Sequence, residues 1–536
     1  MGIRRQRHRE KQQQQHVDDR LFLEALKKCT ISDSAEENKT FLNDIFKDSS
    51  DFVIRDFQLD DRTDALLIYI DGLAKTDSVD LAMKTLMFLD HHQSIEEQMK
   101  RIKSSILPVT QLADTDNYGD MLSHVLSGDS VLLVNGSRLA IALGLRGSEH
   151  RSVSEPETES VIRGPREGFT ENLRTNTSLI RRKIKSPNLK MQPLVVGRET
   201  NTNVVVSYIH GLVDPQLVEE IVSRIQKIDI DGIFESGYIE ELIQDNGYSP
   251  FPQVQYSERP DTVSAALLEG RIAILVDGTP FVLIAPTVFF HWLQASEDYY
   301  ERFMTATLLR MLRLVFLFVA LLAPAIYIAV TTFHQEMIPT NLLLSIAASR
   351  EPIPFPAVIE ALIMEIAFEA LREAGIRLPR TIGQAVSILG ALVVGQAAVQ
   401  AGIVSAAMVI VVSVTGIASF TLPRYNAAIS IRTLRFPLMI MASIFGLLGI
   451  VIGVMMIVGH MARLRSFGIP YLSPVGPLSV TDLKDVVIRV PWWNMDKRPD
   501  FLGATDRSRM SESTADKSGS QQNETGAGDN DESDRK

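Results

Sequence analysis

The sequence predicts an α/β soluble region of two tandem related subdomains, followed by an α-helical polytopic membrane domain. Two observations predict this architecture. The same order of strand, turn and helix signals occurs twice before residue 300, and uncharged apolar runs recur between residues 314 and 461. About 20 residues of helix rise roughly 30 Å, the thickness of the hydrocarbon core of a bilayer. A backbone in lipid must satisfy its own hydrogen bonds, so we expect these runs to be membrane helices.

Two strand signals carry the soluble repeat. The run ALLIYI at 65–70 is followed by an Asp-Gly turn, and the run VVVSYI at 204–209 is followed by His-Gly. A helical pattern follows each strand, and each copy ends with a hairpin whose turn is Asn135-Gly136 or Asp277-Gly278. Because these signals keep their order and nearly their spacing, we interpret the two segments as copies of one α/β unit. Chance similarity of two α/β segments is the alternative.

Composition and these patterns together predict the domain boundaries. In chain order we expect a disordered basic tail at 1–19, the first α/β subdomain at 20–147, a basic join at 148–190, the second α/β subdomain at 191–300, the membrane domain at 301–463, a C-terminal segment at 464–500 and a disordered tail at 501–536. Both tails are too poor in apolar residues to bury a core, which is why we expect them to be disordered.

Within the membrane domain, uncharged runs predict spans at about 314–333, 382–400, 405–422 and 436–461. A further helix is expected at 354–375, which reads PFPAVIEALIMEIAFEALREAG. Prolines mark its start and a glycine marks its end. It is apolar enough to enter a membrane, yet it carries four glutamates and an arginine.

The spacing of the glutamates predicts an acidic face on that helix. Residues about one turn apart share a face, so Glu365 and Glu369 line up with Val358 and Leu362, while Glu360 points away. A charge at membrane depth is costly unless it faces water or a partner. Either the acidic face lines an aqueous ion path, or the helix lies on the membrane surface with its carboxylates in solvent. In the first case the carboxylates would form stacked rings and the two apolar residues a constriction.

Several functional classes find no support in the sequence. Cys29 is the only cysteine, which excludes an intramolecular disulfide and a cysteine-based metal site. We find no glycine-rich phosphate loop, no nucleophile elbow and no paired metal-binding histidines. We therefore predict no catalytic residues, no cofactor and no metal site. The basic N-terminal tail has no interleaved aromatic residues, so nucleic-acid binding is not expected.

The join between the two subdomains is rich in arginine and lysine. It reads ESVIRGPREGFTENLRTNTSLIRRKIKSPNLK from Glu159 to Lys190. A solvated linker is one interpretation. The Gly-Pro and Gly-Phe pairs instead favour a defined backbone path, in which Arg163, Arg166 and Phe169 hold the two repeats or adjacent subunits in register. The basic groups would then meet an acidic neighbour, a partner subunit or lipid headgroups.

Three long segments resemble the A subunits of GerA-type spore germination receptors. They are the join, the acidic helix with the run that follows it, and the late segment LRSFGIPYLSPVGPLSVTDLKDVVIRVPWWNM; with the repeats, the likeness covers about residues 41–499. The resemblance implies a multi-pass protein of the spore inner membrane. It implies a B subunit similar to amino-acid transporters and a lipoprotein C subunit as partners. It also implies a homo-oligomer, a pentameric ring that forms a nutrient-gated ion channel.

The expected function is therefore that of a receptor subunit that releases monovalent cations to start germination. The alternative is a secondary transporter whose acidic helix binds a coupling ion. Arg302, Arg310 and Arg313 precede the first span and place the soluble region in the cytoplasm. Five crossings would put the C-terminal segment outside, whereas a re-entrant acidic helix would restore an even number. The sequence decides neither this topology nor the nutrient.

Overall fold

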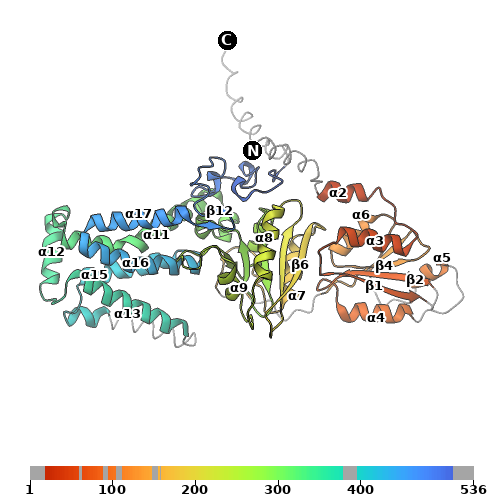
Figure 1. The fold of residues 1–536 in the computed structure, drawn as a ribbon, viewed down its shortest axis with the longest axis horizontal. Helices are drawn as coiled ribbons and strands as arrows, with labels where there is room; N and C mark the ends of the chain where they lie inside the picture. Colours follow the sequence, from red (N-terminus) through yellow and green to blue (C-terminus); the bar gives the residue numbers. More distant parts are fainter. Residues whose placement is uncertain are drawn as a thin grey trace, which may run out of the picture. The chain divides into compact units, whose positions relative to one another are not determined.

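The protein divides into a unit of α/β repeats and a unit of helices (Figure 1). The computed structural model describes residues 19–59, 63–87, 95–103, 111–147, 155–156, 158–377 and 395–510. Most of the first unit is the chain up to Thr287, and it also includes the residues from Pro491 onward. The helical unit comprises Val288–Val490 together with a short loop, Tyr248–Gln253, inserted in the second repeat.

The first repeat is a five-stranded antiparallel sheet, in the order β1-β2-β4-β5-β3, between two layers of helices. Its elements are α2 (Asp19–Leu26), α3 (Ala35–Ile45), β1 (Phe52–Leu59), β2 (Thr63–Ile70), α4 (Thr76–Met87), α5 (Ile95–Arg101), β3 (Leu112–Thr115), α6 (Tyr118–Leu126), β4 (Ser130–Val134) and β5 (Ala140–Leu143). One core lies between the sheet and α2, α3 and α6, and the other lies between the sheet and α4 and α5. The central strands are therefore apolar on both faces.

The second repeat has the same strand order, β6-β7-β9-β10-β8, again with antiparallel neighbours. Its elements are α7 (Leu173–Lys183), β6 (Leu189–Val196), β7 (Thr202–Ile209), α8 (Pro215–Gln226), α9 (Ser236–Ile243), β8 (Gln255–Ser257), α10 (Pro260–Leu268), β9 (Ile272–Val276) and β10 (Val282–Ala285). The hairpin glycines of the two repeats, Gly136 and Gly278, have positive φ angles of 85° and 87°. That conformation is what a tight hairpin demands of its glycine. The identical order confirms the predicted tandem repeat.

The second repeat begins earlier than the sequence predicted. The expected boundary at 190/191 cuts through β6, and the join contains α7, whose first turn is capped by the side chain of Asn172. The inner face of α7 packs into the core of the second repeat with Leu179 and Ile180. This part of the join is therefore a structural element of the second repeat, not a solvated linker.

A buried ion pair links the two repeats. Arg181 on α7 donates from Nε to Asp51 Oδ2 at 2.6 Å and from Nη2 to Asp51 Oδ1 at 2.9 Å. Its third nitrogen, Nη1, donates to the carbonyl of Ser186 at 3.0 Å. Nearby, the backbone amide of Ser50 donates to the carbonyl of Met191 at 3.1 Å. Because the start of β1 is tied in this way to α7 and β6, we expect the repeats to move as one body.

Replacing Arg181 with alanine should destabilise the α/β unit by about 3–5 kcal/mol, since Asp51 would keep a buried charge without its partner. Thermal unfolding of the purified chain measures the effect. The matched control is Arg174→Ala, because Arg174 pairs with Asp71 on the surface at 3.4 Å. Such exposed pairs contribute under about 1 kcal/mol. Equal losses for the two variants would contradict a clamping role for Arg181.

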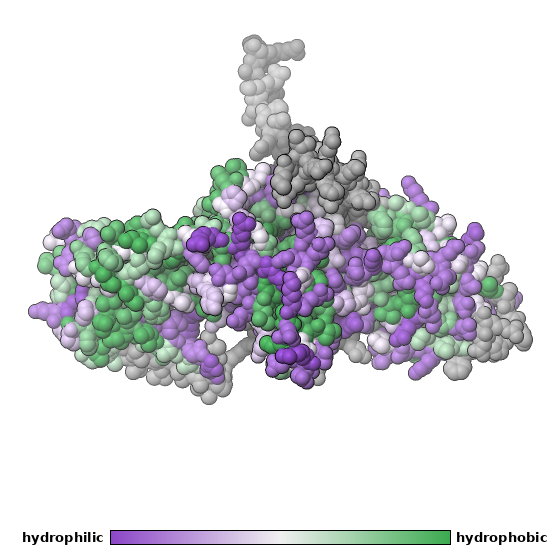
Figure 2. Space-filling model, viewed as in Figure 1, coloured by the Kyte–Doolittle hydropathy of each residue, from purple (hydrophilic) through white to green (hydrophobic). Residues whose placement is uncertain are grey.

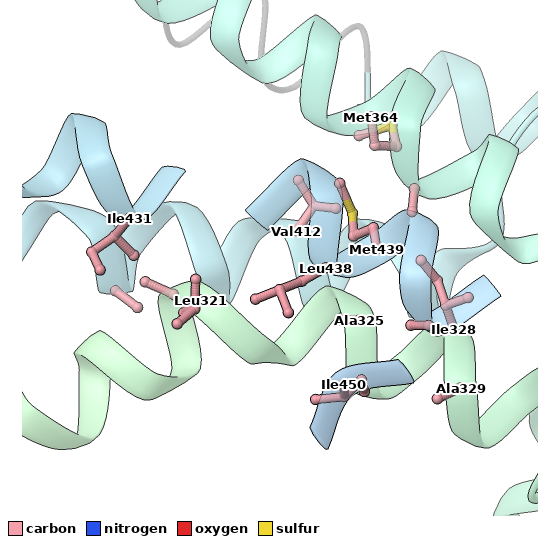
Figure 3. Close-up of a cluster of buried hydrophobic side chains, with 14 of the residues drawn as sticks. Leu321, Ala325, Ile328, Ala329, Met364, Val412, Ile431, Leu438, Met439 and Ile450 are labelled. Carbon is pink, nitrogen blue, oxygen red and sulfur yellow. The ribbon is translucent and has the colours of Figure 1, made fainter. Parts of the chain in front are cut away.

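The described part of the helical unit contains six long helices. They are α11 (Phe303–Thr332), α12 (Thr340–Arg350), α13 (Ala357–Arg377), α15 (Ala406–Phe420), α16 (Tyr425–Phe445) and α17 (Leu447–Arg463). Figure 3 shows the core where α11, α13, α15, α16 and α17 meet, with side chains such as Leu321, Met364 and Leu438 between them. Among the described residues, α11 and α16 are long and apolar enough to cross a membrane, and α15 and α17 are shorter apolar helices.

The face of this unit that Figure 2 shows is also rich in apolar side chains. Exposed residues of this kind lie along α11, α15, α16 and α17 and include Phe318, Ile417, Ile444 and Met455. A soluble protein rarely exposes contiguous apolar patches of more than a few hundred Å². Such a surface is typical of helix bundles that contact lipid or other subunits.

The last predicted span, 436–461, is wrong as a single helix. The structure divides it at Gly446, which has a φ of +61° and separates α16 from α17. The two helices pack closely, because a Cβ on Gly449 would collide with the carbonyl oxygen of Met441. The remaining spans agree with α11 and α15 apart from their ends. The predicted span 382–400 lies largely outside the described residues.

Side-chain contacts define the directions of the first helices. The end of α11 meets the start of α15, where Tyr327 Oη and Ser405 Oγ are 3.5 Å apart. Near the start of α13, Glu360 accepts a hydrogen bond from the Ser405 amide. Near its end, Arg372 donates to Ser419 on the last turn of α15. Helices α13 and α15 therefore both run opposite to α11.

The last two helices form a hairpin. Gly446 at its turn lies against Phe333, at the end of α11. At the opposite end, Phe251 of the inserted loop lies in a buried cluster with Ala427 near the start of α16 and Met461 near the end of α17. The inserted loop thus marks the end of the bundle at which α11 and α16 begin and α17 ends.

The predicted boundary of the disordered tail at 501 is also wrong, because residues up to 510 pack against the second repeat. Ala504 belongs to the core of that repeat, and the amide of Thr505 donates to the carbonyl of Leu212 at 2.9 Å. Arg509 forms an ion pair with Glu269 at 2.9 Å. Apolar residues in an otherwise polar stretch provide this anchor. Residues 511–536 and 1–18 lie outside the described part of the chain.

Candidate functional site

The candidate site is built on α13. The helix follows three prolines, and the carbonyl of Pro356 accepts the amides of its first turn. Ala361 and Met364 face the core of the bundle, whereas Ile359, Ile363 and Ile366 form an exposed row. Because α13 packs against α11, α15 and α16, more than half of its circumference faces protein. Acidic side chains on that wide inner arc must find partners within the bundle.

The first acidic residue, Glu360, was predicted to point away from the acidic face. In the structure it is fully buried. Glu360 accepts a hydrogen bond from Arg350 Nε at 3.2 Å and another from the backbone amide of Ser405 at 3.0 Å. Ser405 is the N-cap of α15, so Glu360 places a negative charge at the positive end of that helix. The role of Glu360 is therefore to tie α12, α13 and α15 together.

The second acidic residue forms a buried ion pair with α16. Arg435 Nη1 donates to Glu365 Oε2, and both side chains are almost completely shielded from solvent. Among the described residues, nothing accepts from Arg435 Nε or Nη2, and nothing donates to Glu365 Oε1. A buried ion pair offsets its desolvation cost only if its remaining polar atoms are also satisfied. This pair is therefore costly to break, but it contributes little to stability.

The third acidic residue bridges two arginines. Glu369 pairs with Arg372 one turn later at 3.0 Å and with Arg432 of α16 at 3.3 Å. Arg372 lies between the rings of Phe368 and Phe420, with its guanidinium carbon 5.0 and 4.8 Å from their centroids. Glu369 stays 31% exposed, which makes it the more accessible of the two carboxylates.

We refer to the ion pairs of Glu365 and Glu369 with Arg372, Arg432 and Arg435 as the latch. Three guanidinium groups there face two carboxylates, and the pairs connect α13 to α16. Removing one partner of a buried pair costs about 3–5 kcal/mol. The latch therefore holds α13 in place. Its unsatisfied polar atoms mean that it contributes less to stability than a fully hydrogen-bonded network would.

The two apolar residues of the predicted ion path lie on the same inner arc. Val358 and Leu362 are partly buried and pack against the core of the bundle. In this conformation Val358, Leu362, Glu365 and Glu369 all face the helices of their own chain. A role for them in conduction requires α13 to rotate or tilt.

The three predicted residues of the join have different environments. Phe169 is buried in the core of the second repeat, and its amide donates to the carbonyl of Glu258 at 2.8 Å. Arg163 is exposed, and Arg166 is an exposed residue 3.9 Å from Glu155. The residue of the join that forms a buried ion pair with the first repeat is Arg181, which the sequence showed only as one of the basic residues of the join.

The second repeat also carries a carboxyl group with an unusual pKa. Burial, together with the charges of Glu235 and Glu241, raises the pKa of Glu240 to about 7. Because the pKa is raised on folding, the folded chain binds a proton between about pH 4.5 and 7 that the unfolded chain releases. Glu240 therefore stabilises the fold most below pH 4.5, and this contribution is lost as the pH rises through 7.

We expect Glu240→Gln to flatten the pH dependence of unfolding over this window and to raise stability above pH 7. Thermal unfolding from pH 5 to 8 measures it. The control is Glu219→Gln, at an exposed position on α8. If the pH dependence of unfolding is the same for Glu240→Gln and for the wild type, Glu240 is not the group that causes it.

Comparison with known proteins identifies the family. The model of the Bacillus/Clostridium GerA spore germination proteins matches residues 40–501. The chain belongs to the GerA family. It is 53% identical over 470 residues to the uncharacterized membrane protein YfkQ of Bacillus subtilis, covering 88% of this chain and 91% of that protein. It is 48% identical over 464 residues to spore germination protein KA of the same organism, covering 86% and 85%.

A solved structure of a GerA protein also matches. The N-terminal domain of the A subunit of the Bacillus megaterium germinant receptor GerK3 is 36% identical, covers 48% of this chain and 97% of its own, and has a TM-score of 0.39. The residues that form the latch and the join all lie inside the stretch that matches the GerA family.

Proposed function

We propose that this GerA chain is the membrane-spanning A subunit of a nutrient-responsive germinant receptor, and that several copies form a cation channel. The observation that supports it most is the latch, two layers of carboxylates and arginines inside a helix bundle with an apolar outer surface. Ionisable groups at such positions in membrane proteins usually serve an ion path or a switch. In the proposed channel, Glu365 and Glu369 serve as the switch when the channel is closed and as part of the ion path when it is open.

The helix directions support six crossings. With the crossing that the sequence predicts at 382–400, the helices α11, α13, α15, α16 and α17 alternate in direction. The division at Gly446 adds the sixth crossing that the sequence prediction lacked. An even number places the C-terminal residues on the side of the repeats, where residues up to 510 pack. By the positive-inside rule, that side is the cytoplasm.

The described conformation corresponds to the closed channel. In the open channel α13 would rotate or tilt, so that Glu365 and Glu369 form acidic rings around a shared axis and concentrate cations. Val358 and Leu362, one to two turns earlier, would form the apolar constriction. Shifting such an equilibrium from mostly closed to mostly open takes about 5.5 kcal/mol of differential binding. That is comparable to the cost of breaking one buried ion pair.

The nutrient signal would come from partner subunits. A B subunit similar to amino-acid transporters would bind the nutrient, a lipoprotein C subunit would complete the complex, and the complex would lie in the spore inner membrane. The relatives with described roles are spore germination proteins, which supports this assignment.

Ion flux through the purified protein in liposomes tests the proposal. We expect passive potassium efflux that grows linearly with the gradient when the partners and nutrient are present. Slow, saturable uptake coupled to a second ion would instead indicate a secondary transporter. Vesicles loaded with a large impermeant cation serve as the control for leaks in the membrane.

A further inference from the structure

The outer face of α9 carries an apolar stripe. Phe234 lies just before the helix, Tyr238 and Leu242 follow at one-turn intervals, and all three are exposed. The rings of Phe234 and Tyr238 meet edge to face with centroids 6.3 Å apart. The opposite face of α9, with Ile239 and Ile243, is buried in the repeat. Single exposed apolar residues are ordinary, but a contiguous row on a soluble domain is typical of a binding surface.

Acidic residues flank this stripe. Glu235 precedes the helix, Glu241 is exposed on it, and Glu240 lies between them in sequence. Burial raises the pKa of Glu240, and the nearby carboxylates of Glu235 and Glu241 raise it further. A complementary partner would present an apolar side chain next to a cationic group.

The join presents that combination at residues 162–166, which we call the join tip. Ile162 is 94% exposed, and the exposed side chains of Arg163 and Arg166 flank it. Gly164 has a φ of +142°, which allows the backbone to turn between the two arginines. An apolar residue so fully exposed between two cations is suited to contact with another molecule.

Hydrogen bonds to the backbone hold the join tip in place. Arg259 Nη1 donates to the carbonyl of Glu159 at 3.2 Å and its Nη2 donates to the carbonyl of Pro165 at 2.8 Å. Phe169 anchors the chain a few residues later in the core of the second repeat. Because both sides of the tip are fixed, little conformational entropy is lost when it binds.

We propose that the apolar stripe of α9 binds the join tip of a second copy of this chain, with Ile162 against Tyr238 and Arg163 beside Glu241. The contact is heterologous, since different surfaces of the two copies meet, and such contacts repeat around a ring. It rests on the homo-oligomer of the proposed function and assigns an interface to it. A few side chains bury far less than the roughly 1,200–2,000 Å² of a stable interface, so this contact sets the register between subunits.

Disulfide cross-linking tests the contact in the full chain. Cys29 is replaced by alanine, and cysteines are introduced as Ile162→Cys and Tyr238→Cys. Mild oxidation of membranes should then give a ladder of cross-linked oligomers on a non-reducing gel. The control pairs Ile162→Cys with Leu139→Cys, an exposed apolar position on the first repeat, and should give no ladder.

Charge reversal separates this contact from chance collisions. Arg163→Glu should lower the cross-linked fraction about tenfold, equivalent to about 1.4 kcal/mol, and adding Glu241→Arg should restore it. An oligomer of normal size without 162–238 cross-links would overturn the interface and leave the proposed function intact. A monomer by size in detergent, with neither cross-links nor ion flux, would overturn both.

Discussion

Replacing Arg435 with glutamine should open the channel without nutrient. The change leaves the carboxylate of Glu365 buried without a counter-ion, at a cost of about 3–5 kcal/mol. Much of this cost disappears if α13 moves and brings the carboxylate to water, so the open state becomes favoured. Potassium leak from liposomes, or germination of spores without nutrient, measures this outcome. Arg377→Gln is the control, because its pair with Glu373 is exposed.

The double variant Glu365→Gln with Arg435→Gln provides the sharper comparison. Removing both charges leaves no unpaired ion in the bundle, so we expect it to be more stable than Arg435→Gln alone. It should also leak less than Arg435→Gln. Additive losses of stability from the two single changes would show that the side chains do not interact.

The second large effect is expected at Arg310. This residue donates to the buried Asp298 at 2.8 Å from α11, and to Asp485 at 2.7 Å in the segment after α17. Arg310→Ala would leave Arg313 as the arginine paired with Asp298 and would leave Asp485 with the Tyr299 hydroxyl but without this guanidinium, so we expect a loss of about 3–5 kcal/mol. The amount of protein in the membrane and its unfolding temperature in detergent measure it.

Arg310→Lys separates charge from geometry in that cluster. Lysine keeps the positive charge but cannot donate to two carboxylates in the forked geometry of a guanidinium. We expect an intermediate loss. Arg302→Ala at the N-cap of α11, which has no side-chain capping bond, should have a small effect. If Arg310→Ala accumulates in the membrane at the wild-type level, this cluster does not stabilise the contact between α11 and the segment after α17.

Much of the α/β unit follows from local sequence. The buried strands and the Asn-Gly and Asp-Gly turns are strong signals, and the two hairpins that they predict are β4–β5 and β9–β10. The predicted boundary at 190/191 cuts through the edge strand β6, because Pro193 and alternating polar residues obscure the strand pattern. Strands β3 and β8 are too short to give a pattern.

The latch is tertiary, and local patterns do not show it. Arg432 and Arg435 lie just before the predicted span, because the uncharged run begins only at Phe436. The structure starts α16 at Tyr425, which brings both arginines inside the helix. One signal was available. Arg432 and Arg435 are three positions apart and Glu365 and Glu369 are four positions apart, so each pair spans about one helical turn and two helices can pair in layers. Gly446 was missed because the apolar run continues on both sides of it.

The central claim is that the carboxylates of α13 face the conduction path when the channel opens. The direct measurement is the reversal potential of the reconstituted channel in a potassium chloride gradient, for the wild type, Glu369→Gln and Glu360→Gln. We predict a cation-selective wild type, a shift towards zero for Glu369→Gln, and no shift for Glu360→Gln, which is buried against Arg350 and α15. Equal shifts for the two variants would show that α13 does not line the path.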